Sequence, residues 1–380
     1  RPAPPGCTSP GALSAPHRPE HRRTAGHSRF CPFPAPRRPA RISPSSQNHS
    51  NSRQSRGIQS RKRNRWGRPR PFEPDAPRWY NYVFAATWGT RHMPRSLVIV
   101  NPVAGRGAGR LCLERIGRGL RDRGFSTLYA VTSQAGDARE AASARANDCD
   151  LVVVIGGDGT LNEVVNGLPV DRPLALLPLG TGNVLAKELR LPRRLEAFIE
   201  MVAHGRLRQL DVPAANGRRF VAMLGAGLDA DVTAALAARR RGATRMMRYV
   251  GPLLKCLLRR RPPRIEVCVD GAPPAVGWGF ALVSNTRSYG GPFRITPQAA
   301  PDDGLLDVCL LHRGGPLAYI RAILAFTFRC SPLSGAQYLR ARSVRIESPD
   351  QVRYQVDGDA AGLLPVTIGL DGRRLRFVVP

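Results

Sequence analysis

Apolar and polar positions alternate in two different ways along this chain. From residue 96 to about residue 207, short aliphatic runs are separated by longer segments with helical spacing of their apolar residues. The runs predict strands at Ser96–Val100, Ser126–Val131, Leu151–Ile155 and Leu174–Pro178. The longer segments predict helices at Leu111–Arg123, Asp137–Ala146 and Leu161–Gly167. This strand–helix alternation predicts an α/β domain with an open, mostly parallel sheet.

Beyond about residue 207 the pattern changes to short strands separated by turn residues. The predicted strands are Phe220–Met223, Arg264–Val269, Gly279–Val283, Leu305–His312, Ser343–Glu347, Arg353–Val356, Val366–Leu370 and Leu375–Val379. Asp-Gly pairs that begin at Asp270, Asp357 and Asp371 predict hairpin turns. One helical stretch, Val232–Arg261, interrupts the strands. We therefore predict a second domain that is mostly antiparallel and resembles a β-sandwich.

Charge separates a third region from these two. The chain has 58 basic and 28 acidic residues, and residues 1–92 hold 18 of the basic and 3 of the acidic ones. Those residues are rich in Pro, Arg and Ser without helical or strand period, which predicts disorder. The first methionine is Met93, and the folded pattern begins directly after it. We hypothesise that residues 1–92 are an upstream extension outside the native protein; a basic tail that binds nucleic acid or membrane is the alternative.

The predicted organisation is thus a disordered basic extension at 1–92, an α/β domain at 93–208 and a β-rich domain at 209–380. No apolar run reaches the roughly 18 residues of a spanning helix. The eight cysteines show no paired spacing, which is typical of reduced thiols in a cytosolic protein. After residue 92 only His204 and His312 remain, which argues against a His-based zinc site or a Ser-His-Asp triad.

The strongest chemical signal follows the predicted strand Leu151–Ile155. It reads Gly156-Gly157-Asp158-Gly159-Thr160 and leads into a predicted helix. The glycines allow a ligand to approach the backbone closely, and the N–H groups at the helix start favour an anion. Asp158 would repel a bare phosphate, so its presence points to a Mg²⁺ bridge or to proton transfer. A simple strand-to-helix turn capped by the aspartate is the structural alternative.

Two further loops have the same position relative to a strand and a helix. Pro178–Asn183 reads Pro-Leu-Gly-Thr-Gly-Asn after Leu174–Pro178, and Asn101–Gly105 follows Ser96–Val100. The carboxyl ends of parallel strands are where open α/β sheets bind ligands. Three such loops in one domain predict a single phosphate-binding site.

These three loops, in this order and at these separations, resemble the catalytic domain of the diacylglycerol kinase family. Within it they are most similar to the soluble bacterial lipid kinases, which are related to the sphingosine and ceramide kinases. The resemblance covers Arg95 to Pro380, and the chain shares further signatures with the family: Leu210–Val212, Gly225–Ala230, Pro297–Val308 and Val356–Asp359. It implies an ATP-dependent, Mg²⁺-dependent kinase with its active site in the cleft between two domains, a nucleotide-binding domain at 93–208 and a lipid-substrate domain at 209–380.

The resemblance also implies residue roles. The nucleotide-contacting residues would be Asn101, Pro102, Val103, Ala104, Gly105, Thr132, Gly156, Gly157, Asp158, Gly159, Thr160, Leu161, Asn162 and Thr181. The ligands of a structural Mg²⁺ would be Asp303 and the carbonyl groups of Ala300 and Leu305. The family's bacterial base lies in an Asp-Gly-Glu turn, where this chain has Asp357-Gly358-Asp359. The base therefore stays open among Asp359, Asp357 and, as in the eukaryotic sphingosine kinases, Asp158.

A lipid acceptor implies contact with a membrane. The basic amphipathic stretch Val232–Arg264 suits an anionic membrane surface, and a helical hairpin packed on the second domain is the alternative reading. We expect a cytoplasmic enzyme peripherally associated with the inner face of the membrane. The sequence leaves open diacylglycerol, a sphingoid base or ceramide as the acceptor, and a homo-oligomer as the assembly. The net charge of +30 favours a nucleic-acid-binding protein as an alternative, although residues 93–380 carry no recognised nucleic-acid motif. A non-catalytic lipid-binding relative is a further alternative, because Asp359 stands where the family has a glutamate.

Overall fold

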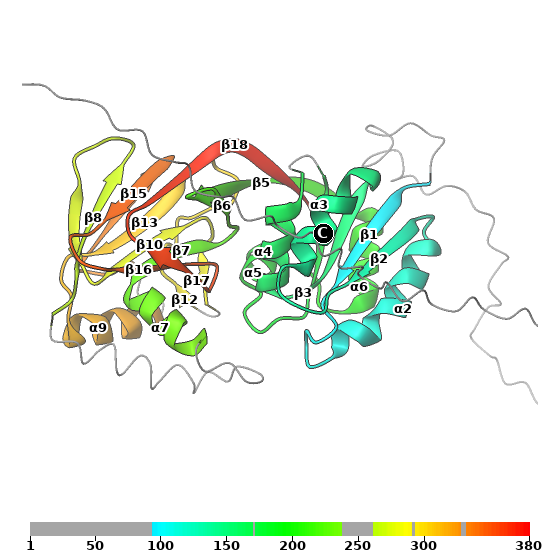
Figure 1. Ribbon diagram of the computed structural model, residues 1–380, viewed down its shortest axis with the longest axis horizontal. Helices are drawn as coiled ribbons and strands as arrows, with labels where there is room; N and C mark the ends of the chain where they lie inside the picture. The colour runs from blue at the N-terminus through cyan, green and yellow to red at the C-terminus, as the bar shows by residue number, and fades with distance from the viewer. Residues whose placement is uncertain (1–92, 170–171, 238–260, 291–292, 328–331) are drawn as a thin grey trace, which may run out of the picture. The chain divides into compact units, whose positions relative to one another are not determined.

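The computed structural model describes residues 93–169, 172–237, 261–290, 293–327 and 332–380 (Figure 1). The extension predicted at 1–92 lies outside the described residues, as does 238–260, the larger part of the basic stretch Val232–Arg264. Within the described part, no helix has both the length and the apolar content that crossing a bilayer requires.

Four parallel strands form the first part of the fold. They are β1 (Arg95–Val100), β2 (Ser126–Val131), β3 (Leu151–Gly156) and β4 (Leu174–Pro178), in the order β2-β1-β3-β4. Every residue of β3 and β4 is buried, as their unbroken apolar runs predict for central strands with both faces covered. The predicted open, mostly parallel sheet is therefore confirmed.

Five α-helices and one 3₁₀ turn connect these strands and follow them. They are α2 (Ala108–Arg121), α3 (Asp137–Arg145), the 3₁₀ turn η2 (Ala146–Asp148), α4 (Asp158–Gly167), α5 (Val184–Glu188) and α6 (Leu195–His204). Helix α2 packs beside α6, and α3 packs beside α4. Helix α4 begins three residues earlier than its apolar pattern predicts, because Gly157 is extended and the glycine loop turns directly into the helix.

The second part of the fold consists mainly of antiparallel strands. They are β5 (Arg206–Ala215), β6 (Arg218–Arg219), β7 (Met223–Gly227), β8 (Arg264–Val269), β9 (Ala275–Trp278), β10 (Phe280–Ser284), β11 (Ser288–Tyr289), β12 (Phe293–Arg294), β13 (Leu306–Leu311), β14 (Ala336–Ala341), β15 (Ser343–Glu347), β16 (Arg353–Val356), β17 (Asp359–Leu363) and β18 (Val366–Val379). Among the described residues, α7 (Leu228–Ala237) and α9 (Pro316–Thr327) are the helices that accompany them.

Apart from β11 and β12, which pair only with each other, these strands form two sheets that share an apolar core, as a β-sandwich requires. One sheet has the order β14-β13-β10-β7-β16-β17, and the other continues the parallel sheet through β18-β15-β8-β9. Their shared core includes Leu224, Ile265, Val308 and Ile368, all without solvent exposure. The sandwich-like second domain predicted from the sequence is thus confirmed.

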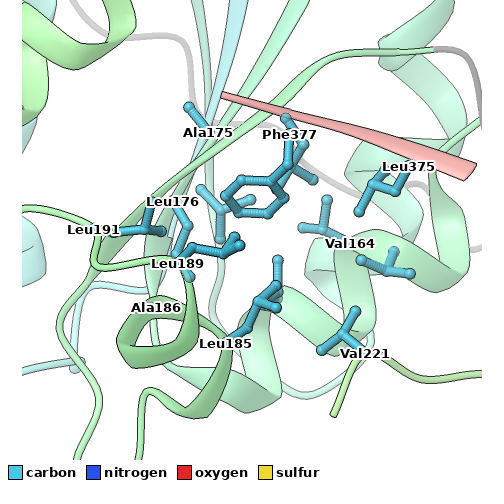
Figure 2. Packing of buried hydrophobic residues seen from close by; sticks show 14 of the residues in the cluster. Val164, Ala175, Leu176, Leu185, Ala186, Leu189, Leu191, Val221, Leu375 and Phe377 are labelled. Atoms are coloured by element: carbon cyan, nitrogen blue, oxygen red, sulfur yellow. The ribbon is translucent and has the colours of Figure 1, made fainter. Parts of the chain in front are cut away.

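Strand β18 belongs to both parts of the fold. Its beginning pairs with β15, and its later residues pair with β5 and, at Phe377, run parallel to Leu174 of β4. Figure 2 shows Phe377 among apolar side chains of the first domain, including Ala175, Leu176 and Leu185. This packing joins the end of β18 to the parallel sheet.

Three local predictions were wrong. A second helix, α9, interrupts the strands where the sequence pattern predicts a single helical stretch. Asp371-Gly372 does not turn a hairpin: residues 366–379 are one strand with a bulge between Leu370 and Arg374, where the positive φ of Gly372 is accommodated. The strand predicted at Phe220–Met223 begins only at Met223 and runs to Gly227. The other two Asp-Gly pairs do form the predicted turns, Asp270 between β8 and β9 and Asp357 between β16 and β17.

Candidate active site

The glycine-containing loops meet at the carboxyl ends of β1, β3 and β4, which are neighbours in the sheet. The Asn101 side-chain amide donates to Thr160 Oγ1 at 3.3 Å, which joins the first loop to the start of α4. The Leu179 N–H donates to the Gly156 carbonyl at 2.8 Å, which joins the Pro178–Asn183 loop to the Gly156–Thr160 loop. The structure therefore brings together three segments that the sequence places far apart.

Only glycine fits where two of these loops touch. A Cβ atom on Gly157 would lie 2.9 Å from Gly180 Cα, and one on Gly180 would lie 2.6 Å from Gly157 Cα. Gly159 differs, because a Cβ there would meet no atom within 4 Å. Gly157 and Gly180 thus serve close packing of the backbone, whereas Gly159 borders open space at the start of α4, where helix N–H groups lack intrahelical partners.

Asp158 connects the start of α4 to the start of α5. Its Oδ1 accepts the Val184 N–H at 2.8 Å, and a Cβ on Gly182 would lie 2.6 Å from its Oδ2. Burial raises the pKa of Asp158, the N–H groups of Val184 and Asn183 offset part of this, and the Asp357 carboxylate raises it further. Asp158 therefore holds two of the loops together and lies within electrostatic range of the Asp-Gly-Asp turn.

The loop that contains Thr132 follows β2 and leads into α3. The Thr132 N–H donates to the Val100 carbonyl at 2.9 Å, and Asp137 Oδ2 accepts the Ser133 N–H at 2.7 Å. The Ala138 N–H donates to Glu163 Oε2 of α4 at 3.2 Å. This fourth loop is thereby held beside the helix that follows the glycine loop.

Asn162 connects the glycine-loop helix to the turn between β16 and β17. Its side-chain amide donates to Asp357 Oδ2 at 2.9 Å, and Asn162 is 3% exposed. Asp357 also accepts three backbone N–H groups at 2.9–3.0 Å, those of Val221, Ala222 and Met223. Burial raises the pKa of Asp357, and these four hydrogen bonds act in the opposite direction. A carboxylate with about four acceptor sites is then fully engaged, so Asp357 has the environment of a structural group.

Asp359 has a more open environment. Its side chain is 41% exposed and forms an ion pair with Arg218, whose Nη2 lies 3.0 Å from Asp359 Oδ2. Arg218 Nη2 also donates to Asn162 Oδ1 at 3.3 Å. Asp359 Oδ1 has no hydrogen bond within the described residues, whereas both carboxylate oxygens of Asp357 are engaged.

Other predicted nucleotide-contacting residues have varied surroundings. Leu161 is fully buried, and its N–H donates to the Gly157 carbonyl at 3.0 Å, so it supports the loop from inside the core. Val103 and Thr181 are exposed, and Pro102 is half-buried. Gly105 has a φ of 61°, a left-handed conformation that glycine adopts without strain.

The predicted Mg²⁺ ligands lie in the turn before β13. Asp303 Oδ1 accepts the Leu305 N–H at 3.0 Å, and its Oδ2 pairs with Arg340. No group of three or more His, Cys, Asp or Glu within the described ranges is arranged to hold a metal, so this set depends on carbonyl oxygens. Asp307 Oδ2 is buried there without a hydrogen-bond partner, and burial raises the pKa of Asp307 to about 6. Hard oxygen donors and one unpartnered carboxylate oxygen suit a hydrated Mg²⁺.

Sequence reasoning missed two residues of this region. Arg218 lies directly after the Asn216-Gly217 turn, and Gln355 precedes the Asp-Gly-Asp turn and accepts the Gly358 N–H at 2.6 Å through Oε1. Neither residue belongs to a glycine loop or a charged cluster in the sequence. Only the pairing of β16 with β7 and the short strand β6 bring them to the site.

Comparisons with known proteins match both parts of the chain. The family described as "Diacylglycerol kinase catalytic domain" matches residues 95–215, and the "YegS C-terminal NAD kinase beta sandwich-like domain" matches residues 222–379. The chain is 30% identical over 295 residues to a diacylglycerol kinase of Bacillus subtilis, which covers 76% of this chain and 97% of that protein. It is 32% identical over 292 residues to one of Mycobacterium tuberculosis, which covers 74% and 94%.

A solved structure shares the fold. The crystal structure of a diacylglycerol kinase from Bacillus anthracis superposes with a TM-score of 0.59 at 23% identity and covers 77% of this chain and 98% of that one. The fold and the family matches define a lipid kinase. The chain belongs to the diacylglycerol kinase family.

Proposed function

We propose that this chain transfers the γ-phosphoryl group of ATP to the hydroxyl group of a lipid such as diacylglycerol. The observation that carries the proposal is the Asn162–Asp357 hydrogen bond of 2.9 Å. It attaches the Asp-Gly-Asp turn to the helix that begins at the glycine loop. The phosphate-binding loop and a turn with a carboxylate able to accept a proton are thereby both attached to helix α4.

In this proposal Asp359 is the base. Its carboxylate accepts the proton of the acceptor hydroxyl, a contribution of about 10²–10⁴ in rate for general bases. Arg218, already paired with Asp359, is placed to offset negative charge on the transferred phosphoryl group. The N–H groups around Gly156–Thr160 would hold the phosphates, and Asp158 would keep the α4 and α5 loops in place. A Mg²⁺ ion held by Asp303 and the carbonyls of Ala300 and Leu305 would stabilise the turn before β13.

The test is phosphate transfer from labelled ATP by the full chain. The acceptor panel contains diacylglycerol, monoacylglycerol, a sphingoid base and ceramide in mixed micelles. We expect one or more labelled lipid products, and their loss in Asp359→Asn. Asp371→Asn, on the exposed bulge of β18, is the matched control and should keep wild-type activity. Absence of any labelled lipid from the wild-type chain would refute the proposal.

We also propose that α9 brings the enzyme to the inner face of a membrane. Its outer side carries Leu317, Ile320 and Leu324, which are 72%, 44% and 51% exposed, with exposed Arg321 among them. Its other side lines an apolar cavity through Tyr319, Ala322, Ile323 and Phe326. An apolar stripe with a basic residue suits the interface of an anionic bilayer.

Co-sedimentation with vesicles of phosphatidylserine and phosphatidylcholine tests this membrane contact. Leu317→Ser combined with Leu324→Ser should lower the bound fraction severalfold. Leu111→Ser is the control, because Leu111 is a leucine of α2 that is 77% exposed and lies on another helix. Equal binding by the wild-type chain and the α9 double variant would contradict the proposed contact.

A further inference from the structure

An apolar cavity of about 330 Å³ lies between α7, α9 and the adjoining strands of the second domain. Its walls are aliphatic and aromatic side chains, including Phe280 and Phe293, together with the inner side of α9. Its volume is near the lower end of the range for small-ligand pockets. The cavity therefore suits one hydrocarbon chain better than two.

One carboxylate interrupts this apolar lining. Asp229, at the start of α7, lines the cavity and is half-buried. The Tyr289 hydroxyl donates to its Oδ1, and the Gln355 side-chain amide donates to its Oδ2 at 2.6 Å. Both donors are neutral, and in the described part of the chain no ion pair compensates the charge of Asp229. A carboxylate has about four acceptor sites, so two remain for a ligand.

Gln355 connects Asp229 to the proposed base. Its Nε2 donates to Asp229, and its Oε1 accepts the Gly358 N–H at 2.6 Å. These two partners fix the orientation of the amide, because a carboxylate accepts and a backbone N–H donates. Gln355 is 1% exposed, so solvent does not compete for either bond. The cavity carboxylate is thus held at a fixed separation from the Asp357–Asp359 turn.

We propose that Asp229 selects the acceptor, by accepting a hydrogen bond from a second donor group beside the hydroxyl that is phosphorylated. The single apolar chain of the acceptor lies in the cavity, its second hydroxyl, amide N–H or ammonium group donates to Asp229, and its reacting hydroxyl faces Asp359. Single-chain lipids with such a second donor are then better acceptors than diacylglycerol, which has two chains and one hydroxyl. The inference rests on the proposed lipid kinase function and narrows its substrate class.

Burying a carboxylate without a compensating charge is costly, which explains why a donor from the ligand is favourable at this position. Burial raises the pKa of Asp229, while its bonds from Tyr289 and Gln355 offset part of the effect. A site built to hydrogen-bond a ligand group discriminates against analogues that lack the group, because its own polar atom is then left unpaired. The position of Asp229 therefore gives it a role in specificity in addition to its role in packing.

The experiment compares 1-monoacylglycerol with 1,2-diacylglycerol of the same acyl chain as acceptors for the full chain. The ratio of their kcat/KM values should favour monoacylglycerol by about tenfold or more in the wild type, as expected for one hydrogen bond to a charged acceptor. Asp229→Asn should abolish this preference through a higher KM for monoacylglycerol and leave the KM for ATP unchanged. Asp371→Asn is the control with the same chemical change and should retain the wild-type ratio.

An ATP-induced rise in the melting temperature verifies that each variant is folded. If Asp229→Asn does not fold, Tyr289→Phe tests the same carboxylate, since it removes one hydroxyl that holds it; the preference should then fall at least about threefold. A wild-type enzyme that prefers diacylglycerol, or a preference that persists in the folded variant, overturns the inference. An enzyme that phosphorylates none of the lipids instead refutes the proposed function, so the two failures are distinguishable.

Discussion

Replacing Asp357 by asparagine tests whether this residue is a structural group. Its Oδ1 accepts the N–H groups of Ala222 and Met223, and its Oδ2 accepts those of Val221 and the Asn162 side chain. An amide would place an NH₂ group where two donors already point, so two hydrogen bonds to a charged acceptor are lost. At about 1.5–3 kcal/mol for each bond, the free energy of unfolding should fall by about 3–6 kcal/mol.

The matched comparison is Asp359→Asn, two residues away. Asp359 is 41% exposed and has one ion pair, with Arg218, so its replacement should change stability by at most about 1 kcal/mol. Its effect should instead be on catalysis, with a loss of about 10²–10⁴ in kcat. The same chemical change at two neighbouring positions therefore separates stability from proton transfer.

Urea unfolding followed by circular dichroism gives the stabilities, and transfer from labelled ATP gives the rates. The measurements are made at pH 8, because burial raises the pKa of Asp357 and the reasoning applies to the ionised carboxylate. Unfolding of Asp357→Asn at the wild-type urea concentration would contradict a structural role for this carboxylate. Wild-type turnover by Asp359→Asn would contradict its role as the base.

Three further predictions follow from packing and burial. Gly180→Ala should lower the melting temperature in a thermal scan, since its Cβ would lie 2.6 Å from the Gly157 Cα atom. Gly159→Ala should fold normally, since its Cβ enters open space, but it should raise the KM for ATP because that space borders the loop. Cys309, whose pKa burial raises to about 12, should resist alkylation at pH 8 for as long as the protein stays folded, while half-buried Cys112 and Cys268 react before it in peptide mapping. Phe377→Ala should cost about 3–5 kcal/mol in urea unfolding, because the side chain is fully buried; a cost under 1 kcal/mol would contradict the described packing.

The glycine loops could be predicted because their requirement is local. A buried apolar run followed by clustered glycines specifies a parallel strand that ends in a close-packed loop, and parallel strands place such loops side by side. The structure adds the reason for individual residues: Gly157 and Gly180 meet backbone to backbone. The resemblance to a kinase family supplied what spacing alone could not, namely the expected chemistry of Asp357-Gly358-Asp359.

The features that the sequence did not reveal depend on pairing between distant strands. Three Asp-Gly pairs look alike in the sequence, yet Asp270 and Asp357 turn hairpins while Asp371 lies in a bulge, since β5 and β15 both pair with that continuous strand. Arg218 and Gln355 have no local signal, because their partners are 141 and 126 residues away. Local patterns specify elements, but such contacts are determined by the complete set of strand registers.

Because β18 pairs with strands of both parts of the fold, the order of synthesis affects how the chain folds. Residues 95–204 leave the ribosome long before residues 375–379, which pair with β5 and pack against β4. Until then the nascent nucleotide-binding half exposes an unpaired strand edge and an apolar patch that Phe377 later covers, features that favour aggregation and chaperone binding. Expression of that half alone should therefore yield insoluble material, and supplying the 366–379 segment as a separate peptide should recover soluble protein.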